Sequence, residues 1–466
     1  MENQKLASWK IPKLLWSLAF PAICAQIVTL LYNMVDRIYI GQMQDGAIAM
    51  AAIGICAPIV TVVTAFTGMF GRGGSPHAAI YMGRQDNKTT EKFLGNSFCM
   101  LLITSVLITS GVLAAKSPIL RLFGASDQTF PYADSYLTIY ILGTIFVQIT
   151  VGMNYYITSQ GFAKTAMITT MLGAVLNMVL DPVFIFAMNM GVAGAALATV
   201  ISQFASFVWV LTFLLGKKPT LRIRVENMRP DWRILKQIII LGSAPFFMSA
   251  SEGVLHVCFN RQVYAYGGDL AVSAMTILFS IFQFVLLPVE GVAQGSQPII
   301  GYNYGSGAYH RVRATIKLAL TANSIFTVIV MAIVVLFPQI FIRVFNSDPG
   351  LVELGSRMLR IYIFGVFTTG ANSTFQQTYN SLGEGGKSFF FAFYRKVILL
   401  IPLIYILPNL LRWGVFADGA LAVVLAEPIS DILTAVTNAL YFRRFIRKKL
   451  PVAADISRGN EENGYA

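Results

Sequence analysis

The sequence predicts an all-α integral membrane protein with twelve transmembrane helices in two pseudo-symmetric six-helix lobes. Hydrophobic residues make up 56% of the 466-residue chain and charged residues only 12%, a composition that a soluble core cannot explain. Apolar stretches of roughly 20 residues, long enough to cross a bilayer as helices, recur along nearly the whole chain. The second half also repeats features of the first at a nearly constant spacing.

The apolar spans fall into two sets of six. The first set lies near residues 14–40, 47–75, 93–115, 132–160, 165–188 and 192–215. The second set lies near residues 237–266, 270–303, 314–338, 352–382, 388–410 and 417–442. The predicted organisation is an N-terminal segment, an N-lobe, a linker, a C-lobe and a tail, at 1–13, 14–216, 217–236, 237–449 and 450–466.

The distribution of basic residues predicts the orientation. Lysines and arginines precede the first span, follow the second, eighth and twelfth spans, and fill the linker. The opposite loops carry few bases, chiefly Lys116, Arg121, Arg343 and Arg412. The positive-inside rule therefore places the N-terminal segment, the linker and the tail in the cytoplasm. The expected location of the chain is the inner (cytoplasmic) membrane of the cell. Because the net charge of +13 is concentrated beside the membrane, it does not indicate nucleic-acid binding.

An internal repeat relates the two sets of spans. Matching residues 222 to 224 positions apart include Pro21 and Pro245, Gly73 and Gly295, Tyr140 and Tyr362, and Gly161 and Gly383. Six spans per half give both halves the same orientation, which is typical of transporters that alternate access between two bundles.

The repeat does not duplicate the intramembrane acids. Through the same offsets, Asp36, Asn177 and Thr199 correspond to Asn260, Leu399 and Val423. The segment LLIPLIY, near the counterpart of Asp181, carries no acid. The scaffold is shared between the halves, whereas the acidic site is expected in the first half alone.

Asp181 lies in the apolar segment LNMVLDPVFIF, where a charged group costs at least about 2.5 kcal/mol. Asn177 is one helical turn before it on the same face, and Thr199 is a plausible neighbour on the next span. Carboxylate, amide and hydroxyl oxygens suit an alkali cation or a proton relay, which Asp36 would join. The alternative is structural: Asp181 satisfies a helix broken at Pro182, and Asp36 pairs with Arg37.

These residues resemble the multidrug and toxic compound extrusion (MATE) transporters, especially their bacterial multidrug-exporting branch. The resemblance covers roughly residues 10–449. It is carried by Pro21 with Asp36 fifteen residues later, by NMVLDP in the fifth span and by GVAGAALAT in the sixth. It implies two lobes forming a V around a central cavity. It also implies export of cationic or amphipathic compounds, driven by inward flow of Na⁺ or H⁺, with no other cofactor.

The same resemblance assigns roles to individual residues. The family's N-lobe cation site falls on Asp36, Asn177, Asp181 and Thr199, where Na⁺ would be the only metal, and Pro21 takes the role of a helix kink. Some members pair an acid in the seventh span with one in the tenth. Here the tenth span reads TTGANSTFQQTYNSLG without a carboxylate, so a second cation site in the C-lobe is not expected. Glu252 and Glu290 are secondary candidates, with helix packing as the alternative.

Polar residues within the spans are candidates for the substrate cavity: Gln26, Tyr32, Asn33, Asn154, Tyr155, Gln283, Gln376 and Asn380. The expected partners are small amphipathic or cationic molecules and membrane lipid, and the chain is expected to be a monomer. No nucleophile with its base is recognisable, so an enzyme is not indicated. The alternative function is a flippase of a lipid-linked precursor. A flippase would require basic residues lining the cavity to bind the pyrophosphate of its lipid substrate. Here the bases Arg37, Arg72 and Arg261 lie near span ends.

Overall fold

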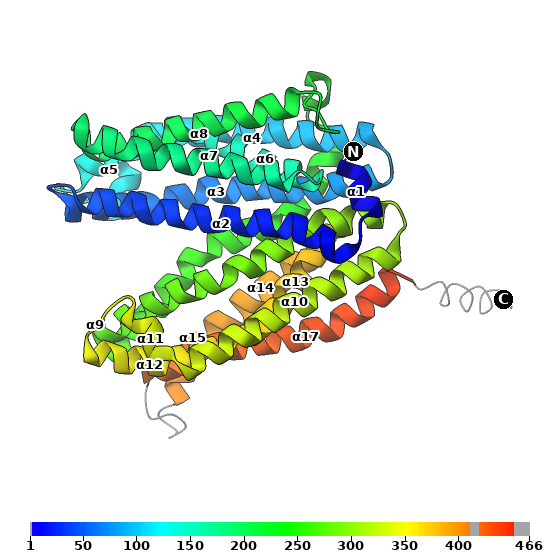
Figure 1. The fold of residues 1–466 in the computed structure, drawn as a ribbon. Coiled ribbons are helices and arrows are strands. Elements are labelled where there is room, and N and C mark those ends of the chain that lie inside the picture. Colours follow the sequence, from blue (N-terminus) through cyan, green and yellow to red (C-terminus); the bar gives the residue numbers. More distant parts are fainter. Residues whose placement is uncertain (1, 411–418, 452–466) are drawn as a thin grey trace.

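The computed structural model describes residues 2–410 and 419–451, and its regular elements are all helical within these ranges (Figure 1). The first half comprises α1 (Glu2–Ser8), α2 (Ile11–Gly41), α3 (Gly46–Gly83), α4 (Asn87–Leu122), α5 (Phe130–Leu142), α6 (Thr144–Ser159), α7 (Ala163–Pro182), η1 (Val183–Ala187) and α8 (Gly191–Leu215). The second half comprises η2 (Val225–Met228), α9 (Trp232–Gly305), α10 (Tyr309–Leu336), α11 (Pro338–Arg343), α12 (Pro349–Ile363), α13 (Val366–Ser381), α14 (Gly385–Phe393), η3 (Tyr394–Leu400), α15 (Ile401–Asn409), α16 (Gly419–Val424) and α17 (Ala426–Lys449). Arg412 and nearly all of the predicted tail lie outside the described residues.

The helices account for the predicted spans. In the described part of the chain, nine helical segments are long and apolar enough to cross a membrane, or ten if α5 and α6, bent by 52°, form one span. The long helix α9 supplies two spans because the chain reverses at Gly268, whose φ of +64° favours glycine. The pair α12 and α13 is more polar and completes the twelve. The predicted all-α membrane class is confirmed, although several helices extend beyond the predicted apolar windows.

Contacts with α3 establish the reversal in α9. A straight helix of 74 residues would be about 110 Å long. Yet a Cβ atom at Gly73 would collide with the Ile238 carbonyl near one end of α9, and a Cβ atom at Gly83 would collide with the Tyr302 carbonyl near the other. Those two glycines are only about 15 Å apart along α3. The two arms of α9 therefore form a hairpin.

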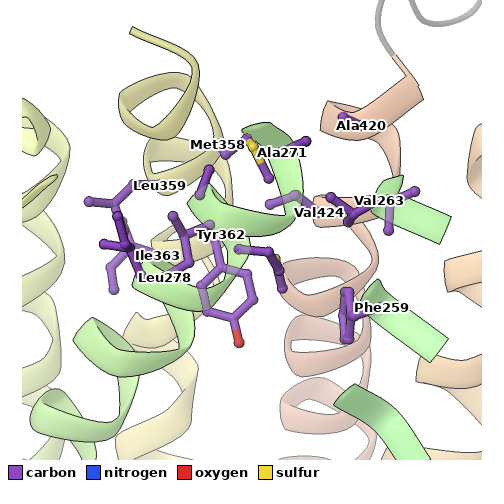
Figure 2. Packing of buried hydrophobic residues seen from close by; sticks show 14 of the residues in the cluster. Phe259, Val263, Ala271, Leu278, Met358, Leu359, Tyr362, Ile363, Ala420 and Val424 are labelled. Atoms are coloured by element: carbon purple, nitrogen blue, oxygen red, sulfur yellow. The ribbon is translucent and has the colours of Figure 1, made fainter. Parts of the chain in front are cut away.

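The hairpin builds the core of the second half. Figure 2 shows side chains from both arms of α9 packing together with α12 and α16. The labelled residues are Phe259, Val263, Ala271, Leu278, Met358, Leu359, Tyr362, Ile363, Ala420 and Val424. This packing fixes the two arms relative to α12, so that polar side chains further along each arm are held in place.

Two helical lobes meet at one end of the molecule and diverge at the other (Figure 1). The meeting end lies near the termini, where α2 and α3 pack on α9. Glycines allow close backbone approach there: a Cβ atom at Gly242 would collide with the Met69 carbonyl, and one at Gly295 would lie 2.6 Å from the Ala19 nitrogen. The molecule is therefore V-shaped and opens away from its termini.

The short N-terminal helix α1 joins the lobes at the meeting end. It precedes α2, yet its residue Leu6 is fully buried against the second half. The guanidinium of Arg311 on α10 donates hydrogen bonds to the Leu6 carbonyl at 3.1 Å and to the Trp9 carbonyl at 2.8 Å. Asn303 Nδ2 on α9 also donates to the Leu6 carbonyl, at 3.1 Å. The N-terminal segment is thus tied to the C-lobe.

Candidate functional site

A buried polar cluster lies in the N-lobe, in the half of the molecule where the lobes diverge. Asn177 and Asp181 occupy one face of α7, with exposed fractions of 2% and 0%. The Asn177 amide donates from Nδ2 to Asp181 Oδ1 at 3.1 Å and to Thr199 Oγ1 on α8 at 3.4 Å. The spacing of one helical turn and the short connection to α8 therefore bring these three predicted residues together.

The fourth predicted residue joins the cluster from α2, which packs beside α7. The carboxyl group of Asp36 lies close to the carboxyl group of Asp181. One buried oxygen on each of Asp36, Asn177 and Asp181 has no hydrogen-bond partner among the described residues. Adjacent Arg37 therefore does not satisfy Asp36 Oδ1.

Three unpartnered oxygens at one buried place are costly unless something binds them. An unsatisfied buried polar group costs about 1–3 kcal/mol, and a buried charge costs more. Two neighbouring carboxylates also repel each other. A proton shared by the carboxyl groups, or a Na⁺ ion held by these oxygens and Thr199 Oγ1, would remove both costs. The donor set fits either species.

Two tyrosines extend this cluster, and the sequence analysis did not select them. Tyr136 and Tyr140 on α5 are buried and stacked, with ring centroids 5.9 Å apart. Tyr136 lies near Asp36, and Tyr140 lies near Tyr32, which is itself close to both carboxyl groups. The one signal for the pair in the sequence is its spacing of four residues, which places both rings on one helix face.

Pro182 is the last residue of α7, and it has no backbone N–H group to donate. After Pro182 the chain continues into the π turn η1. Asp181 Oδ1 accepts a hydrogen bond from Asn177, and Asp181 Oδ2 has no hydrogen-bond partner among the described residues, so Asp181 does not hydrogen-bond the backbone at the break. On the neighbouring helix, α2 remains helical through buried Pro21. The role of Pro21 as a helix kink stays a prediction.

A second polar region lies between the lobes. A cavity of about 190 Å³ is lined by the predicted residues Tyr155, Gln376 and Asn380, together with both secondary acids, Glu252 and Glu290. Arg72 also lines it: its Nε donates to the Tyr155 hydroxyl at 2.8 Å, and its guanidinium lies 5.2 Å from the ring centroid. The remaining cavity candidates, which do not line this cavity, are Gln26, Tyr32, Asn33, Asn154 and Gln283.

Two further intramembrane bases, Arg395 and Lys396, were not named from the sequence. Both lie in η3, inside the eleventh span. Arg395 binds Glu427 Oε1 at 2.8 Å and Asp431 Oδ1 at 2.5 Å on α17. Lys396, with 7% of its side chain exposed, donates to the Met248 carbonyl at 2.9 Å. Partners on neighbouring helices compensate these charges. The signal in the sequence that could have identified these two residues is the RK pair within an apolar span.

Comparisons with known proteins agree on one family. The family model MatE matches residues 21–183 and 246–406. The chain is 25% identical over 398 residues to "Multidrug export protein MepA" of Staphylococcus haemolyticus, covering 85% of this chain and 87% of that protein. It is 22% identical to the protein of the same name in Staphylococcus aureus strain MRSA252, covering 92% and 96%.

Solved structures show the same fold. A ligand-bound structure of the "MATE multidrug transporter DinF-BH" is 33% identical and has a TM-score of 0.86, covering 95% of this chain and 97% of that one. A structure described as the outward-facing conformation of a multidrug resistance MATE family transporter is 23% identical and has a TM-score of 0.88, covering 96% and 99%.

Proposed function

Because the chain belongs to the MatE family, we propose that it exports cationic and amphipathic compounds as a secondary active multidrug transporter. It is a membrane transporter and not an enzyme. Export would be driven by inward flow of Na⁺ or H⁺ and would proceed by alternating access of the two lobes. The observation that carries the coupling mechanism is that one buried oxygen on each of Asp36, Asn177 and Asp181 lacks a hydrogen-bond partner in the described part of the chain.

The coupling site would exchange its ion as the lobes rearrange. If the base asymmetry places the termini in the cytoplasm, the V in this structure opens outward. In that state the N-lobe cluster would take an ion from outside, because its two carboxylates repel each other when no ion is bound to the cluster. The four residues supply two carboxylates, one amide oxygen and one hydroxyl oxygen. Release to the cytoplasm would follow once the lobes close outside and separate at the termini.

The membrane environment and stoichiometry follow the same proposal. Large apolar side chains are exposed on the helices, as at Leu107, Val257 and Leu440, with exposed fractions of 63%, 67% and 66%. Lipid of the cytoplasmic membrane would cover them. Each monomer contains both lobes and a complete N-lobe cluster, so a single chain would suffice for transport.

A flippase of a lipid-linked precursor is less well supported by the cavity. A pyrophosphate would require a net positive surface. Here Arg72 and Lys396 are accompanied by Glu252 and Glu290, and Lys396 lies 3.8 Å from Glu252. This mixed charge does not supply the net positive surface that a pyrophosphate requires.

The test is gradient-driven transport in proteoliposomes, with the cationic dye rhodamine 123 as substrate and with Na⁺ and pH gradients imposed in separate runs. Wild-type protein should transport the dye under one gradient. Asp36→Asn and Asp181→Asn cannot ionise and should each reduce this transport roughly 5- to 150-fold, the range of a coupling energy of about 1–3 kcal/mol. Their thermal stability should be equal or higher, since a buried charge is removed.

The matched control is Asn260→Ala, at the position that the repeat aligns with Asp36. It should leave gradient-driven transport largely intact. Equal losses from Asp36→Asn and Asn260→Ala would show that coupling is shared between the lobes. Normal transport by folded Asp181→Asn would refute the coupling role and leave Asp181 as a structural polar residue.

A further inference from the structure

The cavity between the lobes continues into the C-lobe. A second cavity of about 100 Å³ shares Met248, Glu290, Ser373 and Gln376 with the first and extends to Lys396. Its walls include the aromatic rings of Phe282 and Phe391. The two cavities therefore adjoin, and the second is a half-apolar pocket inside the C-lobe.

Two bases line this pocket, Arg395 and Lys396, and Lys396 has hydrogen-bond donors that no described residue accepts. The ammonium group of Lys396 has three donors, and its one hydrogen bond within the described residues is to the Met248 carbonyl. Glu252 lies 3.8 Å away, beyond hydrogen-bonding distance, and its side chain is 67% exposed. The neighbouring base Arg395 is different, because two carboxylates already bind it at 2.8 and 2.5 Å. Lys396 therefore keeps donors for an anionic group of a ligand.

Two acids line this pocket, Glu290 and Asp431, and Asp431 is already paired with Arg395. Glu290 Oε1 accepts a hydrogen bond from Ser373 Oγ at 2.9 Å, and Glu290 forms no ion pair in the described ranges. Beside it, Thr434 Oγ1 and Asn372 Oδ1 line the same pocket, are buried, and lack described hydrogen-bond partners. Thr434 is 3% exposed. These oxygens can accept hydrogen bonds from a cationic group.

We propose that this C-lobe pocket binds zwitterionic amphipathic compounds, with Lys396 receiving the carboxylate and Glu290 the cationic group. This inference rests on the proposed function and narrows its substrate class. Phe282 and Phe391 would hold the apolar body between the two charges. A compound with a cationic group alone would gain the contact with Glu290 but would be repelled by Lys396. The pocket thereby discriminates by a repulsive element as well as an attractive one.

The test compares two dyes that share one cationic chromophore. Rhodamine B carries a free carboxylate, and rhodamine B ethyl ester carries an uncharged ester in its place. Binding is measured by fluorescence anisotropy at pH 7.5 with full-length protein in detergent. Wild-type protein should bind rhodamine B about tenfold more tightly than the ester, as expected for one additional hydrogen-bonded charge pair.

Three variants assign the preference to residues. Lys396→Gln should bring the affinity ratio to one or below, mainly through weaker binding of rhodamine B. The control Lys164→Gln, at an exposed lysine at the start of α7, should keep the tenfold ratio. Glu290→Gln should weaken both dyes by similar factors and preserve the ratio, because both carry the same cation.

Equal affinities or a preference for the ester in wild-type protein would overturn the inference, and so would an unchanged tenfold ratio in Lys396→Gln. If Lys396→Gln fails gel filtration, the wild-type ratio and Glu290→Gln still decide. Failure of the broader function has a different signature. In that case neither dye binds and neither is transported, whereas failure of this inference alone leaves the ester bound and exported.

Discussion

Arg311 should hold the lobes together at the end near the termini. Its guanidinium, on the C-lobe helix α10, donates to the carbonyl oxygens of Leu6 and Trp9, which belong to the segment leading into the N-lobe. Arg311→Met keeps most of the side-chain stem and removes both donors. We predict that this change shifts the molecule toward states in which the lobes separate near the termini.

The magnitude follows from the two hydrogen bonds. A hydrogen bond to a charged group contributes about 1.5–3 kcal/mol net, and the lower figure applies because Arg311 is only half-buried. The loss of two such bonds amounts to about 3 kcal/mol, or a factor of roughly 150 in the population ratio. Asn303 Nδ2 still donates to the Leu6 carbonyl in the variant, so the factor is an upper estimate.

The assay is the labelling rate of a buried reporter at the lobe interface. Ser75 on α3 is fully buried, and its hydroxyl accepts a hydrogen bond from Gln297 Nε2 on α9 at 3.2 Å. A cysteine at Ser75, in a background without native cysteines, should react with a thiol reagent only when the lobes separate there. Its rate should rise in Arg311→Met by up to the factor above.

A neighbouring arginine provides the control. Arg313 donates to the Leu450 carbonyl directly after α17, so that contact does not involve the N-lobe. Arg313→Met should leave the labelling rate at Ser75 unchanged. An unchanged rate in Arg311→Met, or an equal rise in both variants, would refute a tie between the lobes at Arg311.

Two further predictions concern topology and pH. Single cysteines at Thr220 and Asp269 should react with an impermeant reagent from opposite sides of the membrane. Labelling of both cysteines from outside intact cells would contradict the twelve-span model. Glu384, in the loop before α14, binds Lys387 and, at 2.7 Å, Lys449 on α17. Burial alone would raise its pKa, but these hydrogen bonds outweigh burial and lower the pKa below the ordinary value of about 4.3. The stabilisation is therefore complete above that value and is lost as the pH falls below it. The melting temperature of Glu384→Gln should lie below that of wild type at pH 7 and approach it near pH 3, and an equal gap at both pH values would contradict this.

The sequence predicted those parts of the fold and site that depend on local spacing. Span lengths follow from hydropathy, and the contact between Asn177 and Asp181 follows from their separation by one helical turn. The contact between Thr199 and Asn177 could be predicted because only a short connection separates α7 from α8. The position of Asp36 beside Asp181 depends on helix packing, and it was expected through resemblance to a family.

Other features depend on tertiary contacts that no local pattern records. An apolar window of about 20 residues tolerates two bases, so Arg395 and Lys396 were overlooked within a span. Their burial is explained only by acids on α17 and by the Met248 carbonyl on α9. The approach of Tyr136 to Asp36 likewise requires α5 to pack near α2. The cavity candidates were chosen for polarity alone, and polarity does not determine which helix face meets the space between the lobes.

The two lobes use buried charge in different ways, and the difference follows from counting partners. In the N-lobe, Asp36 and Asp181 lie together, and each retains a buried oxygen without a described partner. Such a site is stable only with a bound proton or cation, so its occupancy can change during a transport cycle. In the C-lobe, Arg395 already holds Glu427 and Asp431, and removal of Arg395 would leave two buried carboxylates unpaired. That cluster is suited to holding α17 against η3 and unsuited to exchanging ions.

Glu290 and Lys396 lie beside the Arg395 cluster, carry opposite charges and have hydrogen-bonding groups that are not used. Together they can bind a ligand with two charges but not a single small cation. We therefore expect ion coupling to reside in the N-lobe and selection among organic substrates to reside in the C-lobe.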